Sequence, residues 1–150
     1  MPNHPPRLER IFQAYSMPLF FVTFNAIDHR AILATRAIHS RFIEFAHGAA
    51  ARNISVGRYV IMPTHIHFFV QSDVDFNLSN WIRVLKRSLS QVIEIPRPHW
   101  QTGSFDHLIR NRESYAQKWD YIRENPVRAD LVTQADEWPY QGEIISINHG

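Results

Sequence analysis

The sequence predicts an α+β fold in which helices pack on an antiparallel sheet. Two observations favour this fold class. Short segments rich in β-branched and aromatic residues alternate with longer segments whose apolar residues recur at helical spacing. The chain has 150 residues, of which 45% are hydrophobic and 20% charged, as expected for one domain with its own core. We therefore expect residues 1–150 to form a single domain, with 1–18 as an irregular N-terminal arm and 141–150 as a tail.

The first half of the chain predicts a strand, a helix and a pair of strands. Leu19–Phe24 is rich in β-forming residues and predicts the first strand. Thr35 is a suitable N-cap for a helix over residues 35–51. Ile54–Met62 and His65–Gln71 predict two further strands, and the short Pro-Thr break between them favours antiparallel pairing through a tight turn.

The second half predicts two helices and a short strand. Asn77 is a suitable cap for a helix that continues to about Ile93 and has one apolar face. Residues 100–108 predict a short strand. The last helix covers Glu113–Glu124, and we expect it to stop there because Pro126 disfavours helical geometry in the residue before it. The order of elements is therefore β-α-β-β-α-β-α.

Composition excludes several classes of protein. The chain has no cysteine, which excludes disulfides, thiol catalysis and cysteine-ligated metal sites. Any metal ligands must come from the 9 histidines, from carboxylates, from amides or from water. No apolar run approaches the roughly 18 residues of a transmembrane helix. Residues 1–10 lack the apolar centre of a signal peptide, and we therefore expect a cytoplasmic protein.

The distribution of charge is compatible with nucleic-acid binding. Fourteen of the 16 basic residues are arginines, which suit bidentate phosphate contacts. Residues 81–128 hold nine basic and five acidic side chains, whereas 129–150 hold four acidic and no basic ones. An ordinary solvated surface has the same pattern, so the charge does not decide between the two. The candidate DNA-binding residues are Arg83, Lys86, Arg87, Arg110, Arg112, Arg123 and Arg128.

Two histidines in the third predicted strand are candidate metal ligands. His65 and His67 are two residues apart, so both side chains point to the same face of the sheet. Two neutral imidazoles at this spacing can chelate one divalent ion. The pattern alone leaves open that they are structural, hydrogen-bonded histidines. Ile66 and Phe68 point to the opposite, core-facing side, but Phe69 places an apolar group on the histidine side.

A tyrosine and an asparagine near the end of the last predicted helix form the second candidate pair. Tyr121 and Asn125 are four residues apart, which places both on one face of a continuous helix. Asn125 can complete a three-ligand metal site while Tyr121 attacks phosphorus. The alternative is a core tyrosine followed by a helix-terminating asparagine. Lys118, His107 and Glu124 are the candidates for a general base.

Four blocks of sequence, taken together, resemble the single-tyrosine HUH transposases, and in particular the branch called REP-associated tyrosine transposases. The resemblance extends from about residue 20 to residue 140. Two positions depart from the family pattern, which often has Asn at Thr64 and Gly at Asp130. The first two blocks are Met62-Pro-Thr-His-Ile-His-Phe-Phe-Val70 and Trp100-Gln-Thr-Gly-Ser-Phe-Asp-His-Leu-Ile-Arg110. The third runs from Tyr115 through Lys118-Trp-Asp-Tyr-Ile-Arg-Glu-Asn-Pro-Val-Arg-Ala129 to Leu131-Val132, and the fourth is Glu137-Trp-Pro-Tyr140.

The resemblance implies a ferredoxin-like sheet with helices on one face and a catalytic tyrosine on a C-terminal helix. It implies that Tyr121 is the nucleophile and that His65, His67 and Asn125 bind Mg²⁺ or Mn²⁺. Tyr115 lies in the same block but lacks an amide four residues on. The implied partner is single-stranded or hairpin DNA, cut and rejoined through a 5′-phosphotyrosine link, and a homodimer is one implied assembly. The alternatives are a hairpin-binding module that does not cut and a metal-dependent hydrolase that uses water.

Overall fold

The structure is a computed structural model that describes residues 17–147. Nearly all of the predicted N-terminal arm lies outside this range. No helix within it is long and apolar enough to cross a membrane. The regular elements are β1 (Leu19–Asn25), α2 (Arg36–Ala50), β2 (Ser55–Ile61), β3 (His65–Gln71), α3 (Leu78–Ser90), β4 (Phe105–Ile109), α4 (Arg112–Ile122), α5 (Asn125–Arg128) and β5 (Gln141–Glu143), with short 3₁₀ turns at Ile27–His29 and Ala135–Glu137.

The five strands form one antiparallel sheet in the order β4-β1-β3-β2-β5. The first six regular elements follow the β-α-β-β-α-β order of a ferredoxin-like fold. The predicted fold class is therefore confirmed. In the centre of the sheet, β1 pairs with β3 along its whole length, from Leu19 opposite Gln71 to Asn25 opposite His65.

Side chains cap the first turns of the three long helices, as the sequence predicts for two of them. Thr35 accepts a hydrogen bond from the backbone N–H of Ile38, and Asn77 accepts one from Asn80. Each cap satisfies a backbone donor that has no partner inside its helix. Asn111 caps α4 in the same way, and α4 begins at Arg112, one residue before the predicted start at Glu113.

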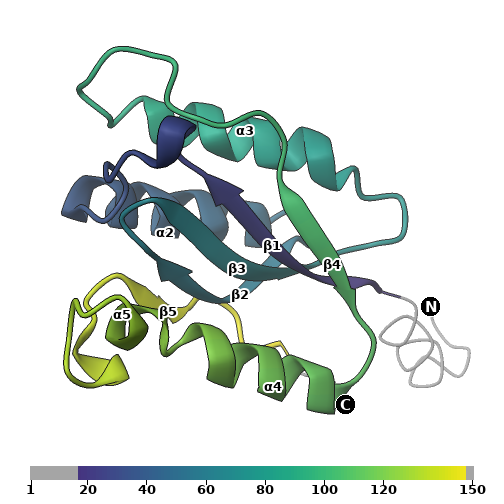
Figure 1. Cartoon of the computed structure of the whole chain (residues 1–150). Helices are drawn as coiled ribbons and strands as arrows, with labels where there is room; N and C mark the ends of the chain where they lie inside the picture. The colour runs from purple at the N-terminus through teal and green to yellow at the C-terminus, as the bar shows by residue number, and fades with distance from the viewer. Residues whose placement is uncertain (1–16, 148–150) are drawn as a thin grey trace, which may run out of the picture.

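Helices cover both faces of the sheet, so the expectation of helices on one face is wrong (Figure 1). On one face, α2 and α3 bury β-strand side chains such as Ile66 and Phe68. On the other, α4 contributes Tyr115 and Ile122 to a second core that includes Phe69. Phe69 can therefore lie on the same face of β3 as the histidines, because α4 shields its ring from water.

The C-terminal segment is part of the fold, and the prediction of a tail from residue 141 is wrong. β5 pairs with the outer edge of β2, with Arg58 opposite Glu143. Beyond β5, Ile147 is only 8% exposed and joins the second core. A strand of three residues is too short to give a periodic pattern in the sequence.

The last predicted helix ends two residues earlier than expected, and a separate short helix follows it. α4 ends at Ile122, and α5 begins at Asn125, so the prediction of one helix over Glu113–Glu124 is wrong at its end. Pro126 lies in the first turn of α5, where a missing backbone N–H costs nothing. After α5, Asp130 has a φ of 60°, and so it keeps the left-handed conformation that glycine usually provides.

Candidate active site

The two candidate histidines lie side by side on the face of the sheet that α4 covers. His65 and His67 belong to β3, and both are half-buried. Their ring centroids are 4.6 Å apart and the ring planes are inclined by 76°. The alternation of side chains along the strand produces this arrangement, as the sequence predicts.

Each histidine is oriented by a threonine hydroxyl. The Thr23 Oγ1 atom on β1 lies 2.7 Å from Nδ1 of His67, and the Thr64 Oγ1 atom lies 2.9 Å from Nδ1 of His65. When Nδ1 carries the proton and donates it to the hydroxyl, the Nε2 lone pair of each ring is available to a metal ion. Thr64, one of the two departures from the family pattern, therefore has a role at the site.

The surroundings of both rings favour the neutral form. The pKa of His67 is lowered to about 3, mainly by burial, with smaller contributions from electrostatic interactions with His65, Lys118 and Arg128. Burial also lowers the pKa of His65, with a smaller contribution from the charge of His29. Neutral imidazole is the form that binds a metal ion.

The Phe21 ring lies in contact with both His67 and the amino group of Lys118 on α4. The ring of Phe21 stacks on His67 with 5.5 Å between centroids and 18° between planes. The Lys118 amino group lies 5.2 Å from the centroid of the same Phe21 ring, a cation–π contact. The candidate base Lys118 is therefore placed beside the His67 ring system, as the electrostatic effect on the His67 pKa also indicates.

Arg128 connects the tyrosine and the asparagine to this site. Its guanidinium group lies over the Tyr121 ring, 4.0 Å from the centroid. It donates hydrogen bonds to the Tyr121 carbonyl at 2.6 Å and to Oδ1 of Asn125. It is also close enough to His67 to lower the pKa of that ring. The sequence predicted that Arg128 binds DNA. It did not predict the contacts of Arg128 with Tyr121 and Asn125, because these depend on the break between α4 and α5.

The two tyrosines of the C-terminal block have different environments. Tyr121 is 63% exposed, whereas Tyr115 is 9% exposed. The Tyr115 ring packs edge-on against Phe69 with 4.5 Å between centroids, and burial raises the pKa of its phenol. A nucleophile must reach its substrate, so the difference in exposure favours Tyr121 over Tyr115.

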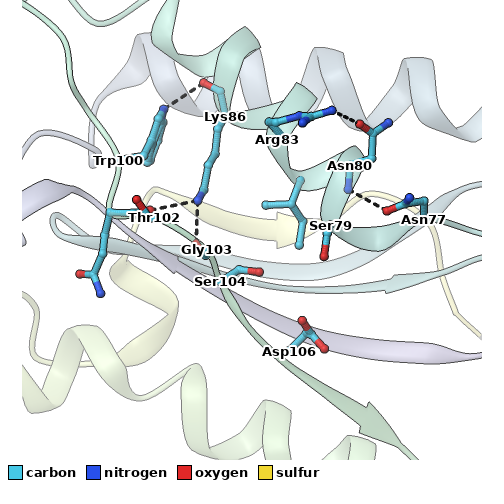
Figure 2. A pocket seen from close by; sticks show the side chains of 12 residues that line it. Asn77, Ser79, Asn80, Arg83, Lys86, Trp100, Thr102, Gly103, Ser104 and Asp106 are labelled. Atoms are coloured by element: carbon cyan, nitrogen blue, oxygen red, sulfur yellow. Dashed lines mark hydrogen bonds between the residues drawn. The ribbon is translucent and has the colours of Figure 1, made fainter.

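The seven candidate DNA-binding residues do not form one surface. Arg83 and Lys86 line a pocket of about 690 Å³ between α3 and the segment before β4 (Figure 2). This pocket lies on the side of the sheet away from the histidines. Lys86 donates hydrogen bonds to the carbonyls of Gln101 and Gly103, and Arg83 donates to Asn80. By contrast, Arg112, Arg123 and Arg128 belong to the α4–α5 region, and Arg87 and Arg110 are exposed.

Comparison with known proteins agrees with the fold. The family model described as "Transposase IS200 like" matches residues 20–115, which is more than half of the chain. The chain belongs to the IS200-like transposase family. The resemblance drawn from the sequence motifs is therefore confirmed. The matched range includes His65 and His67 but ends before Tyr121 and Asn125.

Several relatives of this IS200-like transposase are known. It is 28% identical over 124 residues to a REP-associated tyrosine transposase of Escherichia coli (strain K12), covering 81% of this chain and 73% of the relative. It is 30% identical over 96 residues to a putative REP-associated tyrosine transposase of Haemophilus influenzae, covering 53% of each. Its fold matches the structure of a REP-associated tyrosine transposase bound to a REP hairpin, with a TM-score of 0.71, 23% identity and coverage of 89% and 90%.

The side chains of the transposase fit a divalent ion only in part. Within residues 17–147, no group of three or more His, Asp or Glu side chains could hold a metal ion, so a site here needs a further ligand of another kind, such as an amide or water. His65 and His67 are neutral and oriented, as ligands must be. The Asn125 Oδ1 atom accepts a hydrogen bond from Arg128, but an amide oxygen has a second lone pair for a ligand.

Sequence reasoning missed the residues that support the site. Thr23 and Thr64 gave no signal, because their role depends on which strands pair and on where the turn lies. Phe21 was assigned only to a strand. One signal was present: Phe69 places an apolar side chain beside the histidines, and this predicts that another element covers that face.

Proposed function

We propose that this protein cleaves and rejoins single-stranded DNA, with Tyr121 as the nucleophile. The observation that carries the proposal is the position of Arg128, which contacts Tyr121 and Asn125 and whose positive charge also lowers the pKa of His67. It links the phenol and the amide to the face that holds the histidines. Membership of a transposase family supports a DNA-cleaving enzyme.

The substrate that we propose is hairpin DNA formed by a repeated palindrome. A structural relative is described as bound to a REP hairpin, and proteins similar in sequence are named as REP-associated. Arginines of the α4–α5 region, such as Arg123, supply charge for the phosphate backbone. Arg83, Lys86 and Arg87 on the other face would contact a second part of the same hairpin.

In the proposed reaction, Tyr121 Oη attacks the scissile phosphorus. A bond forms between the phenol oxygen and phosphorus, and the bond from phosphorus to the 3′ oxygen breaks. The phenol loses its proton, and the 3′ oxygen leaves as a hydroxyl after taking up a proton. The reverse attack by a 3′-hydroxyl rejoins a strand, so the energy of the phosphodiester is conserved.

His65, His67 and Asn125 would hold Mg²⁺ or Mn²⁺ beside the scissile phosphate. A bound divalent ion supplies charge that polarises the phosphate and stabilises the leaving oxygen. The protein itself holds both imidazoles in the neutral form and fixes their orientation through Thr23 and Thr64. The neighbouring Lys118 is the candidate acid or base for the proton on the phenol or on the 3′ oxygen.

The test is to trap the covalent intermediate. The protein is incubated with Mn²⁺ and labelled hairpin oligonucleotides that carry single-stranded flanks, and adducts that survive denaturation are measured. We expect an adduct in the wild type and in Tyr115→Phe but none in Tyr121→Phe. Cleavage without an adduct would indicate a hydrolase, and tight binding without cleavage would indicate a binding module. An adduct that persists in Tyr121→Phe would assign the nucleophile to another residue.

A further inference from the structure

An exposed pair of aromatic rings, Phe105 and the candidate base His107, lies at the edge of the sheet. Phe105 and His107 belong to β4 and lie on the same face, since they are two residues apart on a strand. Their ring centroids are 6.5 Å apart and the planes are inclined by only 6°. The strand therefore presents two parallel rings on one surface.

These rings lie on the same face as the candidate metal ligands. Across the sheet, Phe105 is opposite Thr23 on β1, and Thr23 is opposite His67 on β3. Directly opposed residues on antiparallel strands share a face. With strands about 4.8 Å apart, the backbones of Phe105 and His67 are separated by roughly 10 Å. His107 is likewise opposite Phe21, whose ring stacks on His67.

The exposure of Phe105 is unusual among the described residues. Its side chain is 60% exposed, although a phenylalanine gains about 1.5–3 kcal/mol when it is fully buried. Among the described residues, the large aromatic side chains that are exposed are Phe105 and Tyr121. The proposed nucleophile and this ring are therefore both open to a ligand.

The chemistry around the rings suits a single strand of nucleic acid. Within the described part of the chain, β4 is the edge strand of the sheet, and no further strand of residues 17–147 covers its outer side. Arg110 and Arg112, both exposed, follow directly after β4, and they supply charge for a phosphate backbone. The carboxylate between the rings, Asp106, lies on the opposite face of the strand and lines the pocket of Figure 2. The anionic group thus points away from the rings.

We propose that Phe105 and His107 form a stacking platform for an unpaired DNA base beside the phosphate that Tyr121 attacks. The proposal rests on the proposed function, because it takes the histidine face as the cleavage site. Aromatic rings bind unpaired bases without regard to sequence, since every base has a π-face. The platform therefore holds the strand in place next to the reactive phosphate but does not read its sequence.

The test combines a protein variant with a DNA lesion. A set of hairpin oligonucleotides carries one abasic site at each position of the single-stranded flank in turn, and binding is measured by fluorescence anisotropy without divalent metal. In the wild type, we expect one flank position at which loss of the base weakens binding by about 5- to 150-fold, the range for one base–aromatic stack. In Phe105→Ala, binding to intact DNA should fall by a similar factor, and that position should become insensitive.

Three controls make the result interpretable. Phe105→Trp should restore both affinity and the sensitive position, because it keeps a stacking surface. Val74→Ala removes another exposed apolar side chain, 71% exposed in the connection between β3 and α3, and should bind as the wild type does. Circular dichroism checks that Phe105→Ala is folded, which we expect for an exposed position.

Two outcomes would overturn the platform. One is wild-type affinity in Phe105→Ala, and the other is an equal loss of affinity for every abasic oligonucleotide. The adduct assay with the wild type separates this failure from that of the proposed function. If no adduct forms but the paired effects of Phe105 and one base remain, the stacking platform stands and strand cleavage is refuted.

Discussion

Replacing Arg128 should slow the attack of Tyr121 more than it weakens DNA binding. The guanidinium lies 4.0 Å from the Tyr121 ring centroid and donates to the Tyr121 carbonyl at 2.6 Å. An exposed cation–π contact contributes about 0.5–1 kcal/mol, and a solvent-exposed charged hydrogen bond about 1 kcal/mol. If both contacts are needed to orient the phenol, Arg128→Ala loses about 2 kcal/mol, which corresponds to a rate about 30-fold lower.

The assay is single-turnover adduct formation at saturating DNA, so that weaker binding does not affect the observed rate. Arg128→Lys keeps the charge but loses the planar group that stacks on the ring, and its rate should lie close to that of Arg128→Ala. Arg36→Ala, an exposed arginine at the start of α2 on the other face, is the matched control and should react at the wild-type rate. A wild-type rate in Arg128→Lys would refute the orienting role and leave only a charge contact with DNA.

Three further changes test other parts of the structure. Thr23→Val removes the hydroxyl that orients His67 and should weaken Mn²⁺ binding about 10- to 100-fold in calorimetry, whereas the exposed Thr133→Val should not. Ile147→Ala should lower the free energy of unfolding in urea by about 2–4 kcal/mol, because Ile147 is 8% exposed in the second core; a loss below about 0.5 kcal/mol would contradict that packing. Burial raises the pKa of Tyr59 from 10.0 to about 12, so the phenol ionises at a lower pH in the unfolded chain than in the folded protein. The free energy of unfolding should therefore fall as the pH rises from about 10 to about 12. Between pH 9 and pH 11 the free energy of unfolding should fall by about 1 kcal/mol in the wild type and by less in Tyr59→Phe. An equal fall in both proteins would show that Tyr59 is not the cause.

The sequence predicted those parts of the fold that local chemistry determines. His65–Gln71 was placed correctly as a strand because its flanking turn and its β-forming residues agree. Thr35 and Asn77 marked the starts of α2 and α3, because a capping side chain acts within its own helix. The histidine pair followed from the alternation of side chains along the same strand.

What the sequence could not predict depends on contacts between distant segments. The position of α4 against Phe69 results from packing between residues far apart in the chain, which no local pattern encodes. The role of Arg128 depends on a helix break between Ile122 and Asn125. From the sequence, Pro126 was equally compatible with the end of one helix and the beginning of another.

The break between α4 and α5 has a consequence for the recognition of related proteins by motif. The Tyr121 carbonyl accepts a hydrogen bond from the side chain of Arg128, in the place where an unbroken helix would pair it with the backbone of Asn125. The interval of four residues is therefore not dictated by helical periodicity. A search pattern that tolerates an insertion or deletion between the phenol and the amide, but requires the arginine after them, should recover relatives that a fixed interval misses.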